Sequence, residues 1–302
     1  MLHTTQPISR VALILSSAVG DSLLMMTVAR NLSMNGIAVT VFGQQINEMR
    51  SWFPRANIEP ELRLDECAAK LAGFDTVIQL HANKPFIHLE RLHPKVIILA
   101  HLCSANSKES MAERLTRFCR DELRLALVDK GNGITPLPGL QHRQRLLRVA
   151  IHPMASTTDK CWLASRFIRL AIKLRDAGFD PQFVVAPEER KHWTHIDRVG
   201  LKLADEGSLD QVAAWLYECG WFIGNDSGIG HLASSLQIPT LSLFMRRGTA
   251  RTWRPGWGVG HVLIGSSLLP TGRLKERYWK YMLSVRKVSE AFDRLRALTA
   301  ET

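Results

Sequence analysis

The stretch between residues 221 and 244 constrains the fold of this chain more than any other. An apolar strand starts at Trp221, a loop of small and polar residues follows, a helix comes next, and a second apolar strand ends at Phe244. This order of strand, loop, helix and strand is the repeating unit of an open α/β sheet. The chain is therefore expected to be built from parallel strands with helices between them.

The loop of this unit, Asn225-Asp-Ser-Gly-Ile-Gly-His231, has the composition of an anion site. Asp226 or Ser227 can cap the helix, and Gly228 lets the backbone come close to a ligand. The N–H groups and the dipole at a helix start favour a negative charge such as a diphosphate, and His231 would face the same point. A capped turn with a core histidine is the alternative. The position of the loop at the carboxyl end of a strand, where open α/β sheets bind ligands, favours the anion site.

Strands and helical stretches alternate along the rest of the chain, which implies parallel sheets with crossover helices. Further strands are predicted at residues 11–15, 37–42, 74–80, 95–100, 147–151 and 182–186. A length of 302 residues favours two hydrophobic cores over one. Because the run between residues 131 and 139 is the richest in Gly and Pro, we place the N-terminal domain at residues 1–140 and the C-terminal domain at residues 141–302.

The formal net charge of +11 would attract nucleic acid, anionic lipid headgroups or phosphorylated substrates alike. The sequence carries no helix-turn-helix, zinc or RNA-binding signature, which argues against a nucleic-acid partner. No apolar run is long enough to span a bilayer. The five cysteines are odd in number and form no Cys-x-x-Cys pair, so neither a disulfide framework nor a zinc site is expected, and a reducing cytosol fits.

Part of this charge gathers after Phe244, in a segment where arginines and lysines alternate with aromatic residues. The members are Arg246, Arg247, Arg251, Trp253, Arg254, Trp257, Arg273, Lys275, Arg277, Tyr278, Trp279, Lys280 and Tyr281. Any one arginine is explained by a solvated face. The interleaved tryptophans predict that the group forms a basic and aromatic surface patch.

The first predicted strand leads into a small-residue loop that ends at Gly20, followed by a buried helix. The loop has neither the three spaced glycines of a dinucleotide fingerprint nor the Gly-Lys-Ser/Thr of a P-loop, which argues against both classes of nucleotide site. Asp21 stands where the helix begins. A role as helix cap and a catalytic role are both open for this carboxylate.

Five segments resemble the successive landmarks of one enzyme family. They are Arg10-Val-Ala-Leu-Ile-Leu-Ser-Ser-Ala-Val-Gly-Asp21, Phe74-Asp-Thr-Val-Ile-Gln-Leu-His81, Lys160-Cys-Trp162, Ser208-Leu-Asp-Gln-Val-Ala-Ala214 and Asn225-Asp-Ser-Gly-Ile-Gly-His231. In order and spacing they look like glycosyltransferase family 9, the ADP-heptose:lipopolysaccharide heptosyltransferases. The run before Trp162 lacks the usual Lys-Arg-Trp-Pro, and Met245-Arg-Arg follows Phe244 where a glycine is usual.

The resemblance implies the GT-B arrangement, in which two Rossmann-like domains with parallel sheets face each other across a cleft. The acceptor would lie toward the N-terminal domain and the nucleotide sugar toward the C-terminal domain, and the terminal helix, at about residues 285–300, would pack back on the first domain. It also implies sugar transfer that needs no metal or other cofactor and inverts the anomeric carbon.

Several site residues follow from the resemblance. Asp21 matches the general base for the acceptor hydroxyl, and Lys160 matches a lysine that contacts the donor's phosphates and assists catalysis. The other donor-side positions are Ser156, Thr157, Glu188 or Glu189, Asp226, Ser227, Gly228 and His231. The acceptor-side positions are Ser17, Gly20, His81 and Lys84.

The function expected from these residues is transfer of a sugar, heptose from ADP-heptose in the first instance, to a lipid-linked anionic glycan such as the lipopolysaccharide core. The protein would then work in the cytoplasm, held at the inner face of the bacterial inner membrane by its positive charge. The alternatives are a family 9 transferase that uses another nucleotide sugar, and a nucleotide-sugar-binding protein of the same fold without catalysis.

Overall fold

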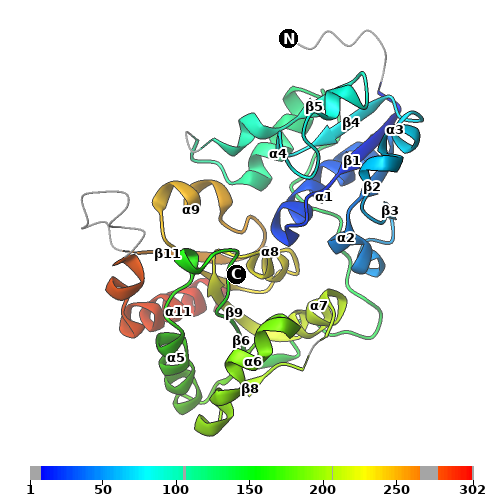
Figure 1. Cartoon of the computed structure of the whole chain (residues 1–302). Helices are drawn as coiled ribbons and strands as arrows, with labels where there is room; N and C mark the ends of the chain where they lie inside the picture. Colours follow the sequence, from blue (N-terminus) through cyan, green and yellow to red (C-terminus); the bar gives the residue numbers. More distant parts are fainter. Residues whose placement is uncertain (1–7, 105–106, 206, 266–277, 301–302) are drawn as a thin grey trace. The chain divides into compact units, whose positions relative to one another are not determined.

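The computed structural model describes residues 8–104, 107–205, 207–265 and 278–300. The chain forms two compact units (Figure 1). One comprises Met1–Ser104 and Met111–Thr135, and the other comprises Ala105–Ser110 and Pro136–Thr302. The chain passes from the N-terminal unit to the C-terminal unit between Thr135 and Pro136, inside the run of Gly and Pro that separates the domains in the sequence analysis.

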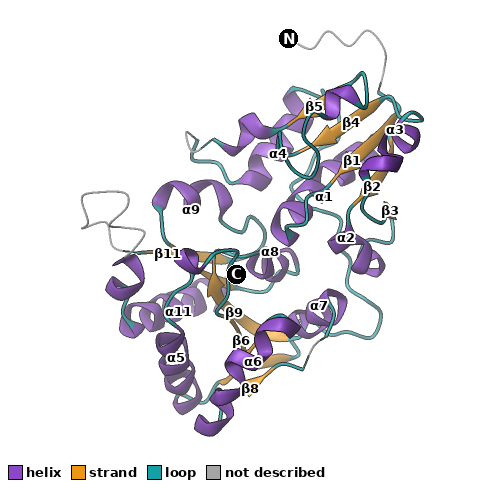
Figure 2. Cartoon of the chain, viewed as in Figure 1, coloured by secondary structure: helices purple, strands orange, loops and turns teal. Residues whose placement is uncertain are grey.

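The N-terminal unit is a five-stranded parallel sheet in the order β3-β2-β1-β4-β5, with helices in the connections (Figure 2). Its strands are β1 (Arg10–Ile14), β2 (Ala38–Phe42), β3 (Asn57–Glu59), β4 (Thr76–Gln79) and β5 (Val96–Ile98). Its helices are α1 (Val19–Met34), α2 (Gln44–Glu48), α3 (Leu64–Leu71) and α4 (Met111–Asp121), with short 3₁₀ helices η1 (Arg50–Trp52), η2 (Leu89–Arg91) and η3 (Ala100–Cys103).

The central strand of this sheet is buried on both faces, as expected of parallel strands covered by helices on each side. Helix α1 is buried along most of its length and packs against α4. In α4 the residues Met111, Leu115, Phe118 and Cys119 recur at helical spacing and are all buried. The N-terminal unit therefore has a complete core of its own.

The C-terminal unit is a six-stranded parallel sheet in the order β11-β10-β9-β6-β7-β8. Its strands are β6 (Arg145–His152), β7 (Asp180–Phe183), β8 (Lys202–Leu203), β9 (Cys219–Asn225), β10 (Thr240–Phe244) and β11 (Gly260–Ile264). Its helices are α5 (Ala164–Asp176), α6 (Arg190–Trp193), α7 (Leu209–Tyr217), α8 (Gly228–Ser235), α9 (Arg247–Trp253) and α11 (Val285–Ala300), with 3₁₀ helices η4 (Thr158–Lys160), η5 (Pro187–Glu189) and η6 (Thr194–Val199).

The terminal helix α11 belongs to the core of the C-terminal unit. Val288, Phe292 and Leu295 are buried there together with residues of α5 and the central strands, and the Phe292 ring meets the Trp221 ring edge to face with centroids 5.5 Å apart. The resemblance predicted that this helix packs on the N-terminal domain. In the structure the buried face of α11 packs against α5 and the central strands of the C-terminal unit.

The predicted fold class is confirmed, because both units are α/β with a parallel sheet. In each sheet the strand order reverses between two central strands, β1 and β4 in the first and β6 and β9 in the second. Loops that leave the carboxyl ends of strands at such a switch point diverge and leave room for a ligand. Where the chain is described, no helix combines the length and the apolar character needed to cross a bilayer.

Candidate active site

At the switch point of the N-terminal sheet, Asp21 and His81 meet. Asp21 lies in the first turn of α1, just after β1, and His81 follows β4. The His81 Nε2 atom lies 2.8 Å from Asp21 Oδ2, and the two side chains are 24% and 21% exposed. Helix α1 is capped by the backbone at Ala18 with no side-chain hydrogen bond. The carboxylate is thus not the helix cap and is turned toward the neighbouring loop.

His81 is held in its charged form. The hydrogen bond to Asp21 and a second one with Cys103 raise the pKa of His81 to about 9, against the opposing effect of burial. At neutral pH the imidazolium and the Asp21 carboxylate therefore form an ion pair. Sequence reasoning placed His81 on the acceptor side but missed Cys103, which reaches the site on the 3₁₀ turn after β5.

The remaining acceptor-side residues differ in how close they come to this pair. Gly20 is buried in the first turn of α1, next to Asp21, whereas Ser17 is exposed. Lys84 is also exposed and forms a backbone bridge with His81. The loop residue that contacts Asp21 is Ser16, whose hydroxyl donates to Oδ2 over 3.3 Å. The sequence analysis did not single out Ser16.

At the switch point of the C-terminal sheet, Lys160 and Asp226 meet. Lys160 ends η4 in the loop after β6, and Asp226 directly follows β9. Lys160 Nζ lies 3.2 Å from Asp226 Oδ2, with the lysine side chain 34% exposed and the carboxylate 11% exposed. The cation is thus the more accessible member, which suits a lysine that binds phosphate.

Helix α8 starts beside this pair as the sequence predicts. Ser227 is its cap, with the hydroxyl accepting from the backbone N–H of Gly230 over 3.4 Å, and Gly228 is the first helical residue. His231 is only 5% exposed and meets the Trp257 ring edge to face, with centroids 6.3 Å apart. His231 is therefore a buried histidine in the first turn of α8. This matches the alternative in which the loop is a capped turn with a core histidine.

Ser156 and Thr157 are exposed on the loop that leads to Lys160. The backbone carbonyl of Thr157 accepts from the N–H of Lys160 over 3.1 Å, which closes the turn. Glu188 and Glu189 lie in η5, after β7. The Glu189 carboxylate accepts from the backbone N–H of Ala186 over 3.2 Å, whereas Glu188 is exposed and makes no polar contact with the described residues.

Asn225 holds the two donor-side loops together, and the sequence analysis gave it no role of its own. It is fully buried; its amide nitrogen donates to the Pro153 carbonyl over 2.6 Å, and its amide oxygen accepts from the Trp162 backbone N–H over 3.0 Å. Pro153 and Trp162 stand at the two ends of the loop that carries Lys160. The Asn225 side chain therefore fixes that loop beside Asp226.

The same loop is tied from the C-terminal segment. The Trp279 indole N–H donates to the Asp159 carbonyl over 2.8 Å, and the Trp162 indole N–H donates to the Leu283 carbonyl over 2.9 Å.

His152 ends β6 and bonds the Val184 carbonyl through Nδ1 over 2.8 Å. Burial lowers the pKa of His152 to about 4, so this histidine is neutral.

The predicted basic and aromatic patch is wrong for two of its tryptophans. Trp257 is 5% exposed and Trp279 is fully buried, because their indoles pack into the C-terminal unit. Tyr278 and Tyr281 are exposed. The predicted members Arg273, Lys275 and Arg277 lie outside the described residues. Of the other basic members, Arg246, Arg247 and Arg251 are exposed, whereas Arg254 is half-buried and bonds the Lys108 carbonyl.

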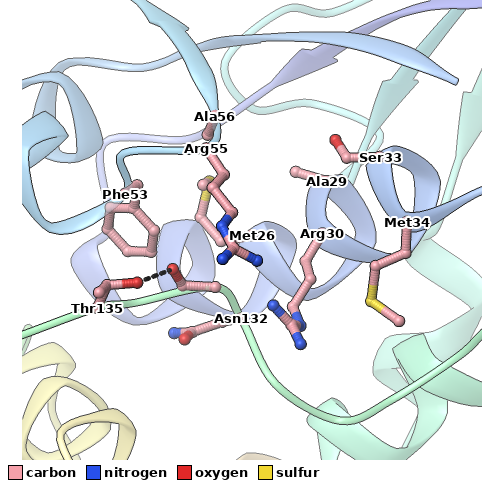
Figure 3. A pocket seen from close by; sticks show the side chains of 11 residues that line it. Met26, Ala29, Arg30, Ser33, Met34, Phe53, Arg55, Ala56, Asn132 and Thr135 are labelled. Atoms are coloured by element: carbon pink, nitrogen blue, oxygen red, sulfur yellow. Dashed lines mark hydrogen bonds between the residues drawn. The ribbon is translucent and has the colours of Figure 1, made fainter. Parts of the chain in front are cut away.

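A cavity of about 440 Å³ lies elsewhere in the N-terminal unit (Figure 3). The second half of α1 lines it from Met26 to Met34, together with Phe53 and Arg55. None of the predicted site residues is among its lining. Within the described part of the chain, no group of three or more His, Cys, Asp or Glu residues is arranged to hold a metal ion.

Comparisons with known proteins agree with this description. Residues 139–276 match the sequence model of glycosyltransferase family 9 (heptosyltransferase). No curated protein sequence matches the chain. Among solved structures, the family 9 glycosyl transferase from Veillonella parvula is similar, with a TM-score of 0.72 at 16% identity over 97% of this chain and 98% of that one.

Two E. coli structures are similar as well. The ADP-heptose lps heptosyltransferase II has a TM-score of 0.71 at 18% identity, over 97% of this chain and all of that one (100%). The heptosyltransferase WaaC with ADP has a TM-score of 0.66 at 15% identity, over 95% of this chain and 99% of that one. At these identities the structures establish the fold. The match to the glycosyltransferase family 9 model lies within the C-terminal half of the chain, so the chain resembles that family there.

Proposed function

We propose that the protein transfers heptose from ADP-heptose to a hydroxyl of an anionic glycan of the lipopolysaccharide core, with inversion at the anomeric carbon. The observation that carries the proposal is the placement of two opposite groups at equivalent points of the two sheets. The Asp21 carboxylate lies at the switch point of one sheet and the Lys160 ammonium at the switch point of the other. A sugar transfer needs one group that accepts the proton of the attacking hydroxyl and another that stabilises the negative charge on the leaving diphosphate.

On the donor side, negative charge grows on the departing diphosphate as its bond to the sugar breaks. Lys160 and the first N–H groups of α8 meet this charge in the proposal, and Asp226 holds the ammonium in position until the phosphates bind. Groups that are fixed before the reaction stabilise the transition state more than the bound donor. These groups replace a metal ion, so we expect transfer to continue in excess chelator.

On the acceptor side, Asp21 takes the proton of the attacking hydroxyl. The hydroxyl oxygen forms the new bond to the anomeric carbon on the face opposite the diphosphate, and the electrons of the broken bond leave with the diphosphate. A single displacement of this kind inverts the configuration. The proposal requires the donor and the acceptor, each bound by its own unit, to come together during the reaction.

Glu188 is the carboxylate that we assign to the nucleoside or sugar of the donor. Glu189 is already bonded to the backbone N–H of Ala186, whereas Glu188 is exposed on the same turn. We expect Glu188→Gln to weaken donor binding about tenfold, as loss of one hydrogen bond to a charged group does. Calorimetry with Glu189→Gln as the matched control tests this assignment. Equal losses in both variants would contradict it.

The acceptor and the location follow from the charge in this proposal. A net charge of +11 favours an anionic acceptor and an anionic membrane surface, and Arg247, Arg251 and Tyr281 are exposed in the C-terminal unit. The protein would work in the cytoplasm at the inner face of the inner membrane. Co-sedimentation with anionic and neutral vesicles tests this, and binding that is equal for both or insensitive to salt would contradict it.

The central experiment incubates the purified protein with ADP-heptose and a core oligosaccharide acceptor. We expect release of nucleoside diphosphate that requires both substrates, and a product whose new bond has the inverted configuration by NMR. A panel of other ADP-, UDP- and GDP-sugars identifies a different donor if ADP-heptose gives no product. Donor binding without transfer from any sugar would favour the second candidate, a nucleotide-sugar-binding protein without catalysis.

A further inference from the structure

The two oxygens of the Asp21 carboxylate have unequal surroundings. Oδ2 accepts hydrogen bonds from His81 Nε2 over 2.8 Å and from the Ser16 hydroxyl over 3.3 Å. Oδ1 accepts none from the described residues. The side chain is 21% exposed. The protein therefore fixes Oδ2 of the carboxylate, and Oδ1 is available to accept a proton from a bound substrate.

The residues that fix Oδ2 are themselves held by their neighbours. The Ser16 carbonyl accepts from the Ser22 hydroxyl over 2.9 Å, which fastens the loop to α1. His81 has a second hydrogen bond, with the Cys103 thiol. The carbonyl of Leu102, beside Cys103, accepts from the buried guanidinium of Arg114 over 2.5 Å. The two groups that contact Oδ2 are thus anchored in turn, Ser16 to α1 and His81 to the turn η3.

From this geometry we propose that His81, together with Ser16, is a positioning residue that fixes Oδ2 of Asp21, so that Oδ1 accepts the proton of the acceptor hydroxyl. This inference rests on the proposed function. In the step itself the proton moves from the acceptor oxygen to Oδ1 while that oxygen bonds to the anomeric carbon and the diphosphate leaves with its electron pair. His81 touches neither substrate. It sets the direction of the carboxylate through its contact with Oδ2.

The alternative is that His81 takes the proton and Asp21 only orients it, as a carboxylate orients a histidine in hydrolase triads. The contacts argue against it. Nε2 of His81 is occupied by Asp21 Oδ2 over 2.8 Å, and Cys103 also interacts with the ring. The titratable groups that face His81 are the Asp21 carboxylate and the Cys103 thiol, with Lys84 bridged to it through the backbone. A histidine that stays protonated to about pH 9 is a poor base at neutral pH.

Two substitutions at His81 separate charge from hydrogen bonding. His81→Gln can keep an N–H donor near the position of Nε2 without the charge, and His81→Leu removes both. His101→Gln is the matched control, because His101 forms a comparable contact with Glu122, over 3.4 Å, away from Asp21. The readouts are kcat, the KM of the donor, and the pH profile of kcat/KM.

We expect His81→Leu to lower kcat about 100-fold, and His81→Gln about tenfold, with the donor KM within about threefold of the parent protein. In His81→Gln the fall in rate that accompanies deprotonation of His81, toward about pH 9 in the parent protein, should be lost. The control should match the parent. A purely structural role for His81 would leave the pH limbs in place.

Other outcomes overturn the inference in distinguishable ways. A parent protein that transfers no sugar contradicts the proposed function itself. If the parent protein is active and His81→Gln has the same pH profile of kcat/KM as the parent, only the positioning role is contradicted. A parent rate that climbs until about pH 9, with His81→Gln as inactive as Asp21→Asn, would make His81 the base. NMR titration of His81 gives a check without activity, and a pKa near 6.5 would exclude the ion pair.

Discussion

The two switch points carry the same kind of ion pair with the charges exchanged. In the N-terminal unit the carboxylate, Asp21, follows the first strand and the cation, His81, follows β4. In the C-terminal unit the cation, Lys160, follows the first strand and the carboxylate, Asp226, follows β9. In the proposed function, one fold offers a proton acceptor at one site and a phosphate partner at the other. The topology supplies the place, and the order of the charges decides the chemistry.

A second pair of residues extends the comparison. Gln79 ends β4 and Asn225 ends β9, and both are fully buried amides. Gln79 donates to the carbonyls of His81 and Phe86, over 2.6 and 2.9 Å, and so shapes the loop of its own strand. Asn225 instead bonds the loop of the neighbouring strand. The Asn225 amide therefore joins two loops of the C-terminal site, whereas the Gln79 amide shapes a single loop of the N-terminal site.

The largest expected effect breaks the symmetry between the two carboxylates. Asp21→Asn should lower kcat about 1,000-fold with donor affinity nearly unchanged, because it removes the proton acceptor. Asp226→Asn should lower kcat only about tenfold, because Asp226 holds Lys160 and takes no part in proton transfer. Steady-state kinetics together with calorimetry of donor binding measures both. Equal losses of kcat would mean that the two carboxylates share one role.

The next effect concerns the two cations. Lys160→Ala should lower kcat/KM about 100-fold and weaken donor binding, because the charge on the diphosphate loses its fixed partner. Lys202→Ala, at an exposed lysine on the edge strand β8, serves as the control and should match the parent protein. Kinetics at saturating acceptor separates the donor effect. A loss of kcat with unchanged donor affinity would exclude a contact in the bound donor.

A smaller effect distinguishes the two buried amides. Asn225→Ala leaves the Pro153 carbonyl and the Trp162 N–H without partners inside the core, which should cost about 2 to 4 kcal/mol of unfolding free energy. Gln79→Ala should cost about 1 to 2 kcal/mol, because water can reach part of the loop that it bonds. Urea unfolding and, separately, scanning calorimetry measure the unfolding free energy of each variant. The reverse ranking would contradict the view that the C-terminal site depends more on buried contacts.

The smallest expected effect is a mirrored response to pH. The pKa of His81 is raised, so its contribution to stability is complete below pH 6.5 and is lost as the pH rises toward about 9. The pKa of His152 is lowered, so its contribution is complete above pH 6.5 and is lost as the pH falls toward about 4. Changes of about 1 to 2 kcal/mol are expected over each window. Melting temperatures of His81→Gln and His152→Gln should show a flatter alkaline slope for the first and a flatter acidic slope for the second.

The sequence predicted the architecture well because its signals were local. Apolar runs followed by small polar loops identified the strands β1, β2, β4, β5, β6, β9 and β10, and the strand predicted at residues 182–186 overlaps the end of β7. The cap predicted at Asp226 or Ser227 marked the start of α8. The short strands β3, β8 and β11 were missed. The strands β3 and β8, of three and two residues, are too short to show periodicity and are defined by pairing with a neighbour.

The site was predictable only in part for a related reason. Single charged residues beside glycines, such as Asp21 and Asp226, stand out in the sequence. Cys103 and Asn225 act through contacts between distant segments, and neither they nor Ser16, which contacts Asp21 within its own loop, carry a distinctive local pattern. The buried tryptophans were misjudged because interleaved charges suggested a surface, whereas Trp279 is fully buried and hydrogen-bonded to the loop at Asp159.

The loop that carries Lys160 takes its shape from outside itself. Asn225 on one strand and Trp279 in the C-terminal segment bond its backbone, and its own Trp162 is anchored to the carbonyl of Leu283. Substitutions among the exposed side chains of residues 156–159 are therefore expected to leave Lys160 in place. In the proposed function, donor preference and the placement of the phosphate partner would then be separable, so that one could diverge during evolution while the other stayed constant.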